Sequence, residues 1–399
     1  MQAIIWWLRI LPVPSEAGGI RMKFRMLLPI FVLFLSLLYA ESPVIKFAEP
    51  SSWRYTGMGG AITAVPEGLD TLIHNPAGLT QKLFYPRKNF ILSFSTQLYF
   101  KPQFLFPILK DISKVDNKLG QILLNAKDLI TSSGLGATPS ISFGYIGSNW
   151  GAGLFITASA FVQGSPFPLG VEGFTMVNLT LPVAYSLKAV EGRLVDISLG
   201  ATFHPSVALY KMLDGSDVDA IVAGRNNVNE ILEGILSTPY VSFPVDLGFL
   251  MVGYDLLYSG NQLRLAASLK NLFGDYFVPG QSVAPLPREL SFTVGLGTLF
   301  PFFIGKIPVD IVISGEAKSL NQLLSGSQTF FKSLAFGLEV AVAKVARIWC
   351  GLSSGYPAVG GQVSLGIFSL GASWQTIESG RYVGDNPLSI FQVGFAFAF

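Results

Sequence analysis

The final stretch of the chain, Leu388 to Phe399, alternates between large apolar side chains and small or polar ones. Successive side chains of a strand point to opposite faces, so this alternation predicts a strand with one apolar face. In outer-membrane barrels the large residues contact lipid and the small ones face the lumen. The stretch therefore predicts the closing strand of such a barrel. The lipid-facing set is Phe391, Val393, Phe395, Phe397 and Phe399, and the inward set is Gln392, Gly394, Ala396 and Ala398.

Composition supports a membrane protein without spanning helices. The chain of 399 residues is 50% hydrophobic and only 13% charged, which is a low charge content for a soluble domain. After residue 40 it has no apolar run of the roughly 18 residues that a membrane helix needs. Only helices and closed barrels satisfy every backbone group in lipid, so a closed barrel is the remaining solution.

The N-terminus carries a targeting signal. Arg21, Lys23 and Arg25 precede the apolar run from Met26 to Tyr39, and Ala40 offers a small residue for cleavage. Residues 22–40 thus have the pattern of a secretory signal peptide. We interpret residues 1–21 as an extension from a start codon placed too early. Cleavage before Glu41 leaves 23 basic and 24 acidic residues, a balance that argues against nucleic acid as a partner.

Residues 41–87 lack strand alternation. Gly57, Gly59 and Gly60 allow tight turns, and the prolines that follow fix bends, which together predict a compact irregular segment. The glycine-rich stretch, followed by Asn75, Pro76 and Ala77, resembles the N-terminal hatch of the FadL-type long-chain fatty acid transporters of bacterial outer membranes. The specific likeness covers Gly57 to Leu79. It implies a plug over residues 41–87 and a barrel over residues 88–399.

From Asn89 onward, alternation predicts about fourteen antiparallel strands, an even number as single-chain barrels require. The resemblance implies the same number. The fold class is therefore all-β, a transmembrane antiparallel barrel with an N-terminal plug and helical extracellular loops. The expected strands are residues 89–101, 138–148, 150–162, 174–187, 193–205, 243–254, 262–273, 288–300, 306–316, 332–343, 345–355, 360–368, 369–377 and 389–399.

The connections between these strands alternate in length. Residues 102–137, 163–173, 206–242 and 274–287 are long, whereas 149, 188–192 and 255–261 are short. Barrels have long external loops and short periplasmic turns, so this order agrees with the fold.

Two of the long connections have apolar residues at helical spacing. These helices could cap the barrel, or their stripes could form an apolar vestibule for a hydrophobic ligand, since clefts for small molecules are mostly apolar. The candidate ligand-binding residues are Ile122, Leu129, Ile221, Val222, Ile231, Leu232 and Ile235.

Little in the sequence indicates catalysis. His74 adjoins the hatch motif, and His204 has inward parity with Ser206 nearby, so a membrane-embedded hydrolase is one alternative. No flanking motif orients either histidine, and the single Cys350 excludes an internal disulfide and cysteine-based metal or redox sites. We expect no enzyme activity, no metal and no cofactor.

Charged residues with inward parity could tether the plug or line a wet pore. They are Asp196, Asp246, Arg264, Asp310, Glu339 and Arg347. Cys350 has lipid-facing parity. Candidates for the interfacial aromatic girdles are Tyr85, Tyr145, Trp150, Trp349 and Trp374.

The resemblance implies a monomer in the bacterial outer membrane that takes up hydrophobic molecules, such as long-chain fatty acids, passively. Its partners would be outer-membrane lipid and the hydrophobic small molecule. Release could follow rearrangement of the hatch or run sideways into the bilayer, and Gly151 and Gly153 could permit a kink in the third strand, as in that family. Two alternatives are a non-transport scaffold or shuttle component of a secretion system, and a general polar porin.

Overall fold

A computed structural model describes residues 51–81, 89–101, 134–165, 170–213, 239–256, 258–280, 285–343, 345–378 and 382–399. Ser42–Phe399 form one compact unit. The expected signal peptide and extension, residues 1–40, lie outside the described residues. Within the described part of the chain, no helix is long and apolar enough to cross a membrane.

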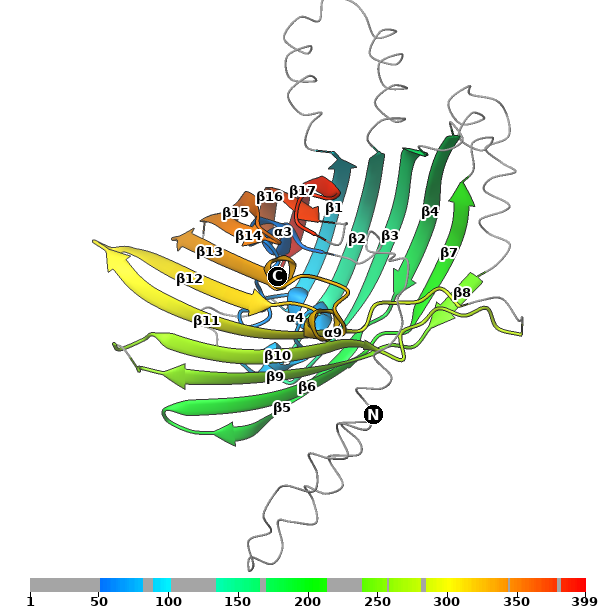
Figure 1. The fold of residues 1–399 in the computed structure, drawn as a ribbon. Helices are drawn as coiled ribbons and strands as arrows, with labels where there is room; N and C mark the ends of the chain where they lie inside the picture. Colours follow the sequence, from blue (N-terminus) through cyan, green and yellow to red (C-terminus); the bar gives the residue numbers. More distant parts are fainter. Residues whose placement is uncertain are drawn as a thin grey trace, which may run out of the picture. The chain divides into compact units, whose positions relative to one another are not determined.

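All strands of the described residues belong to one antiparallel sheet that closes on itself, because β1 pairs with both β2 and β17 (Figure 1). Phe94, for example, lies opposite Phe395 on one side and Ile141 on the other. The strands are β1 (Phe90–Phe100), β2 (Leu135–Ile146), β3 (Trp150–Ser165), β4 (Gly170–Thr180), β5 (Val183–Glu191), β6 (Val195–Phe203), β7 (Ser206–Leu213), β8 (Pro239–Ser242), β9 (Val245–Tyr254), β10 (Gln262–Leu272), β11 (Ser291–Ile304), β12 (Ile307–Ala317), β13 (Leu334–Val342), β14 (Ala346–Ser353), β15 (Tyr356–Leu365), β16 (Phe368–Glu378) and β17 (Pro387–Ala398).

Three neighbouring strands are each interrupted at a proline. Pro182 separates β4 from β5, Pro205 separates β6 from β7, and Pro244 separates β8 from β9. The breaks lie in one row, because the Leu181 amide donates to the Pro205 carbonyl (3.0 Å) and the His204 amide to the Pro244 carbonyl (3.1 Å). Proline has no N–H to donate to the ladder, so it favours an interruption at these positions. Counted as one strand each, the interrupted pairs give a closed barrel of 14 strands, which confirms the predicted fold class.

The predicted order of long and short connections holds with an exception. The connection expected over residues 163–173 shortens to 166–169, because β3 continues to Ser165 and β4 starts at Gly170. Gly164 lies opposite Val171 in the ladder, so the polar, glycine-containing end of β3 extends the strand and does not form a loop. The connection after β14 is also short, since β15 begins at Tyr356. The third strand, in which Gly151 and Gly153 could permit a kink, is continuous as β3.

Burial follows the predicted parity. On β17, Phe391, Val393 and Phe395 are exposed, whereas Gln392 between them is fully buried. On β6, Leu199 and Phe203 are exposed and Asp196 is buried. An apolar outer wall on a closed barrel places the protein in the bacterial outer membrane.

The aromatic candidates for the interfacial girdles separate into two groups. Trp150 is half exposed, and its ring lies 4.8 Å from that of Tyr145. Trp349 is fully buried and contacts Gly57 inside the barrel, so its prediction as a girdle residue is wrong. Tyr85 lies outside the described residues. Cys350, next to Trp349, is exposed as its parity predicted.

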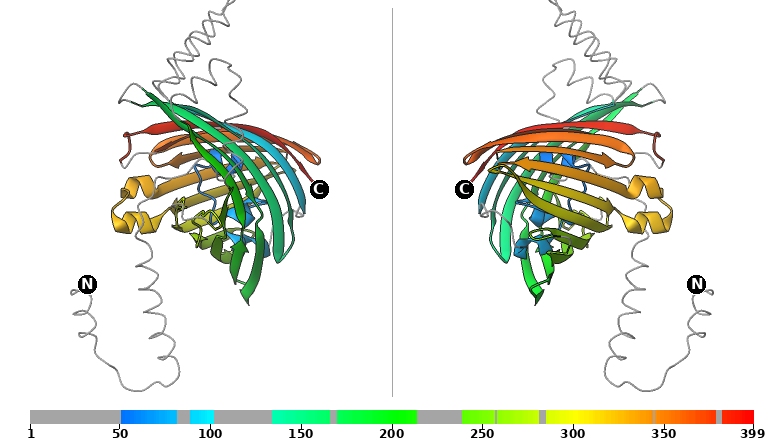
Figure 2. Two further views of the ribbon diagram at one scale, coloured as in Figure 1. Left: turned by 90° about the vertical axis from the view of Figure 1, so that its right-hand side faces the viewer. Right: turned by 90° about the vertical axis from the view of Figure 1, so that its left-hand side faces the viewer.

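Residues 51–81, which we call the inner segment, lie inside the barrel, where Figure 2 shows them in blue between the strands. They contain the short helices α3 (Trp53–Gly57), α4 (Asp70–Ile73) and the 3-10 helix η2 (Pro76–Thr80). Trp53, Met58, Ile62 and Val65 form a buried apolar cluster with Trp349 of the wall. Helices α9 (Leu320–Ser325) and α10 (Phe330–Ser333) lie between β12 and β13.

Candidate functional site

The Asn75-Pro76-Ala77 motif joins the inner segment to the barrel wall. The Asn75 side-chain amide donates to the carbonyl oxygen of Thr63 (2.9 Å) and to that of Phe249 in β9 (3.1 Å). Its side-chain oxygen accepts from the Ala77 amide and caps η2, whose first residue is Pro76. Proline suits the first position of a helix, where its missing N–H would have no partner. Asparagine is thus the residue that can both cap the helix and reach the wall.

Gly59 and Gly60 have positive φ angles of 62° and 77°. A side chain at Gly59 would meet the Leu352 backbone at 2.7 Å, so the site requires glycine for both its conformation and its contact. A Cβ added at Gly57 would lie 3.1 Å from the Cβ of Trp349. The predicted hatch glycines therefore all lie against the wall or in the turn that follows α3.

Four side chains form a charge network between the inner segment and the wall, in which Arg54 and Glu339 are buried and the Glu67 side chain is 41% exposed. Arg54 Nε lies 2.6 Å from Glu339 Oε2 on β13, with both side chains almost fully buried. Arg347 on β14 holds Glu67 through two hydrogen bonds of 2.7 and 2.9 Å, and its Nη1 lies 3.5 Å from Glu339. Two planar guanidinium groups thus alternate with two carboxylates, the geometry that favours bidentate pairing.

The other charged residues predicted to face inward fall into two groups: some contact the inner segment, and others contact residues of the wall. Arg264 donates from Nη1 to Gln81 of the inner segment (2.9 Å). Asp196 accepts from the Tyr254 hydroxyl within the wall (2.9 Å). Asp246 Oδ1 lies 3.0 Å from His204 Nε2. Asp310 is also buried. Glu339, Arg347 and Arg264 thus contact the inner segment, while Asp196 and Asp246 hold strands of the wall together.

The geometry around His204 does not form a nucleophilic pair with Ser206. The Ser206 hydroxyl donates to the His204 carbonyl oxygen (3.0 Å) and pairs with the Thr180 hydroxyl (3.0 Å). His204 faces Asp246 at the row of proline breaks. The other histidine, His74, stacks on Tyr55 with ring centroids 4.5 Å apart. Among the described residues, no group of His, Cys, Asp and Glu side chains could hold a metal ion.

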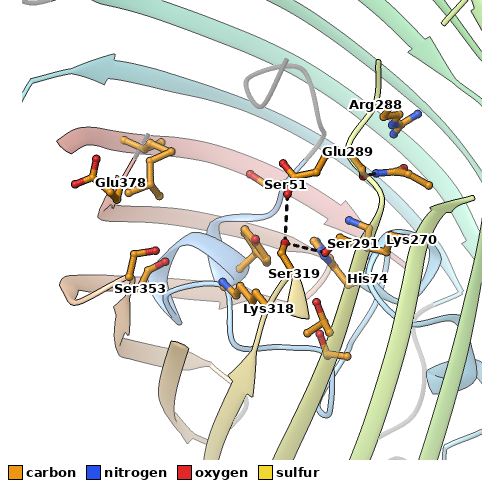
Figure 3. Close-up of a pocket in the computed structure, with 18 of the residues that line it drawn as sticks. Ser51, His74, Lys270, Arg288, Glu289, Ser291, Lys318, Ser319, Ser353 and Glu378 are labelled. Carbon is orange, nitrogen blue, oxygen red and sulfur yellow. Dashed lines mark hydrogen bonds between the residues drawn. The ribbon is translucent and has the colours of Figure 1, made fainter. Parts of the chain in front are cut away.

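A cavity of about 280 Å³ is lined by the inner segment, by strands of the wall and by residues 287–289 and 318–332 (Figure 3). Tyr55 and His74 line it from the inner segment. Lys318 Nζ lies 5.3 Å from the Tyr55 ring centroid and donates to the Gly59 carbonyl oxygen (2.9 Å). Burial lowers the pKa of Lys318, against the opposing charge of Glu316. The charged residues of the lining are Lys270, Arg288, Glu289, Glu316, Lys318, Lys332 and Glu378.

The cavity also has an apolar side. Two buried apolar clusters contribute side chains to it, one containing Met176 and Tyr276 and the other containing Tyr99 and Ile390. These residues come from β1, β4 and β17 and from the connection after β10. The cavity therefore presents charged and apolar groups together, as a site for an amphiphile would.

The predicted ligand-binding residues Ile122, Leu129, Ile221, Val222, Ile231, Leu232 and Ile235 lie outside the described residues. The sequence did not lead us to predict the charged residues that join the inner segment to the rest of the barrel. They are Arg54 and Glu67 in the inner segment, and Glu316 and Lys318 outside it. A signal existed for Glu316, because it has the inward parity of Asp310 on the same strand. Nothing in the irregular inner segment marks Arg54 or Glu67 in advance.

A closed barrel with an apolar outer wall and the chain's own N-terminal segment in its lumen defines an outer-membrane β-barrel of the filled type. No protein-family model matches the chain, and no curated protein matches it. In fold it is similar to the toluene transporter TodX of Pseudomonas putida, at 13% identity and a TM-score of 0.45 over 88% of this chain and 98% of that chain.

Two further solved structures show the breadth of this likeness. A FadL homologue from Pseudomonas aeruginosa has 9% identity and a TM-score of 0.31 over 88% of this chain and 99% of that chain. The transport unit of the autotransporter AIDA-I from Escherichia coli has 6% identity and a TM-score of 0.37 over 88% and 100%.

Proposed function

We propose that the protein is an outer-membrane channel for passive uptake of hydrophobic molecules, with amphiphiles such as long-chain fatty acids as the substrate class, and that it is not an enzyme. The observation that carries the proposal is the cavity above the inner segment, which combines charged groups such as Lys318 with apolar side chains such as Met176. The charged head of an amphiphile could pair with the charged lining groups there while its apolar chain packs against the apolar side chains. The resemblance of the Asn75 motif to FadL-type hatches supports the same class.

The test is binding of a fluorescent long-chain fatty acid to the full chain in detergent, with unlabelled carboxylic acids of increasing chain length as competitors. Competition should strengthen at least tenfold from hexanoate to oleate, because each buried methylene adds about 0.8 kcal/mol. Equal competition by short and long acids would contradict the proposal. Uptake by liposomes that carry the protein then separates transport from binding.

A pair of methionines supplies a matched control. Met176 is buried and lines the cavity, whereas Met212 is exposed. The substitution Met176→Gln should weaken oleate binding several-fold, because it places an amide against the apolar chain. Met212→Gln should leave binding unchanged. The same loss in both variants would argue against the cavity as the site.

The row of proline breaks bears on how the solute leaves the barrel. Pro182, Pro205 and Pro244 interrupt neighbouring strands, and a small cavity behind them is lined by Phe155, His204 and Asp246. We infer that release sideways into the bilayer uses this part of the wall. The triple variant Pro182→Ala, Pro205→Ala and Pro244→Ala should slow uptake and leave oleate binding unchanged.

A general polar porin is disfavoured by the inner segment, which fills the lumen over α3, α4 and η2. A scaffold or shuttle role remains a second candidate that oleate binding would exclude as the sole function. A stable protein partner on extraction from membranes, combined with no oleate binding, would favour that role.

A further inference from the structure

Glycines on the inner wall meet the inner segment at several points around the barrel. They occur as cross-strand neighbours: Gly200 of β6 lies opposite Gly248 of β9, Gly337 of β13 opposite Gly351 of β14, and Gly371 of β16 opposite Gly394 of β17. Each pair removes two side chains from the same part of the wall. We call these six residues the glycine collar.

Each pair of the collar receives a different part of the inner segment. A Cβ at Gly200 would lie 2.5 Å from the Ala77 amide nitrogen, and one at Gly248 would lie 2.2 Å from Asn75 Oδ1. The second pair receives Met58, whose carbonyl carbon would lie 2.6 Å from a Cβ at Gly351. Glycine inside a strand often marks a site where another chain segment approaches closely.

The third pair receives Trp53. A Cβ at Gly371 would lie 2.6 Å from Trp53 Cε2, and one at Gly394 would lie 2.8 Å from Trp53 Cζ3. The indole N–H of Trp53 donates to Gln362 on β15 (2.9 Å). The inner segment is therefore in close contact with the wall at three separate places, and none of them leaves space for one more carbon atom.

Hydrogen bonds fix the orientation of the inner segment against the same wall. The Thr56 hydroxyl donates to Gln392 on β17 (2.7 Å), and the Ser268 hydroxyl on β10 donates to the His74 carbonyl oxygen (2.7 Å). The Thr63 amide donates to Glu316 on β12 (3.0 Å). A movement of the segment as one body would break polar contacts on opposite sides of the barrel at once.

We propose that the inner segment is a fixed floor for the cavity. It is not a hatch that moves when a solute binds or passes. The glycine collar is the feature that holds it. No path along the barrel axis opens, so ions do not cross and a bound solute stays above the floor. This inference concerns the lumen alone and holds whether or not the protein transports an amphiphile.

A disulfide between the inner segment and the wall tests the proposal. The Cβ of Ala64 lies 3.2 Å from a Cβ built at Gly297 on β11, close to the separation of about 3.5–4.5 Å found in disulfides. The variant is Ala64→Cys and Gly297→Cys in a Cys350→Ser background, since Cys350 is exposed. Its oxidised and reduced forms are compared in planar bilayers by potassium chloride conductance, with and without oleate.

The expected result is a current at the level of the bare membrane in both redox states. A current in the reduced form that falls at least tenfold on oxidation would overturn the proposal. Uptake of fluorescent fatty acid by liposomes gives the second readout: the oxidised form should retain the rate of the reduced form. If neither form takes up fatty acid, the transport proposal fails while the conductance result still decides whether the floor is fixed.

Variants of the glycine collar test whether these glycines hold the inner segment in place. Gly200→Ala and Gly248→Ala should each displace the Asn75 motif and raise conductance at least tenfold. Gly361→Ala is the matched control, because that glycine faces outward and its nearest contact is Arg347 O at 3.3 Å. Conductance in the collar variants equal to that of the control would show that the collar does not hold the segment. Should the collar variants fail to insert, the disulfide experiment decides alone.

Discussion

The side-chain amide of Asn75 donates to the backbone oxygen of Phe249, a residue 174 positions further along the chain, over 3.1 Å. This bond joins the start of η2 to the middle of β9. Asn75 is fully buried, and its second N–H is taken by the Thr63 carbonyl oxygen. One side chain therefore orders two parts of the inner segment and ties both to the wall.

Replacement of Asn75 should destabilise the protein strongly. Asn75→Ala leaves the carbonyl oxygens of Thr63 and Phe249 without that donor, at a cost of about 1–3 kcal/mol for each buried group. Asn75→Asp should be worse, because a carboxylate would face both oxygens. Thermal unfolding of the full chain in detergent measures the change. Asn149→Ala, at an exposed connection, is the control and should shift the melting temperature little.

The buried pair of Arg54 and Glu339 should show strong coupling. Removing either charge alone leaves the other buried, which costs about 3–5 kcal/mol. The double variant Arg54→Met with Glu339→Leu should cost clearly less than the sum of the two single variants. A full double-mutant cycle by thermal unfolding checks this. The exposed pair of Lys188 and Glu191 should give a coupling below about 1 kcal/mol, and equal coupling in both cycles would be evidence against the network.

Asp70 should make stability depend on pH. Burial raises the pKa of Asp70 from an ordinary value of 3.8 to about 6, against the charge of Arg54 and a hydrogen bond from Ser52, while Glu67 and Glu339 add to the rise. The folded state thus binds the proton more tightly than the unfolded chain. The resulting stability is complete below about pH 4 and is lost as the pH rises through about 6.

The variant Asp70→Asn should remove this dependence. The size of the effect is about 3 kcal/mol, since one pKa unit corresponds to about 1.4 kcal/mol. Melting temperatures from pH 4 to 7.5 provide the measurement. The wild-type value should fall more steeply over this range than that of Asp70→Asn. Parallel curves for the two proteins would show that Asp70 does not titrate there.

Of the five aromatic residues proposed for the girdles, Trp349 should lower the stability of the protein most when it is replaced. It is fully buried against Gly57, so Trp349→Ala should cost about 3–5 kcal/mol through the cavity that it leaves. Trp150, which is 51% exposed, is the matched control, and Trp150→Ala should cost far less. Denaturant titration in detergent compares the two. Equal losses would place Trp349 outside the core.

The strands and the direction of their side chains could be predicted from the sequence because alternation is a local property. The proline breaks were not predicted, although Pro182, Pro205 and Pro244 all lie within the expected strands. A proline inside a strand pattern indicates an edge or an interruption, so this signal was present. Trp349 could also have been placed, since it has the same parity as Arg347, which was predicted to face inward.

The inner segment could be predicted only in outline. Its glycines and the Asn75 motif indicated a compact unit. An irregular segment has no repeating side-chain pattern, however, so its contacts could not be predicted. The pairing of Arg54 with Glu339 joins residues 285 positions apart. The collar glycines illustrate a different difficulty, because Gly200 and Gly248 are two of 42 glycines in the chain. Their function becomes visible only once parity and cross-strand register are combined.

The pairing of β1 with β17 determines the order in which the molecule can be assembled. The cylinder cannot shut until its last residues have been synthesised and delivered to the membrane. Residues 51–81 contact strands from both halves of the chain, so their full set of contacts exists only once the wall has closed. The pairing that shuts the cylinder and the contacts that occupy its interior are therefore complete only together.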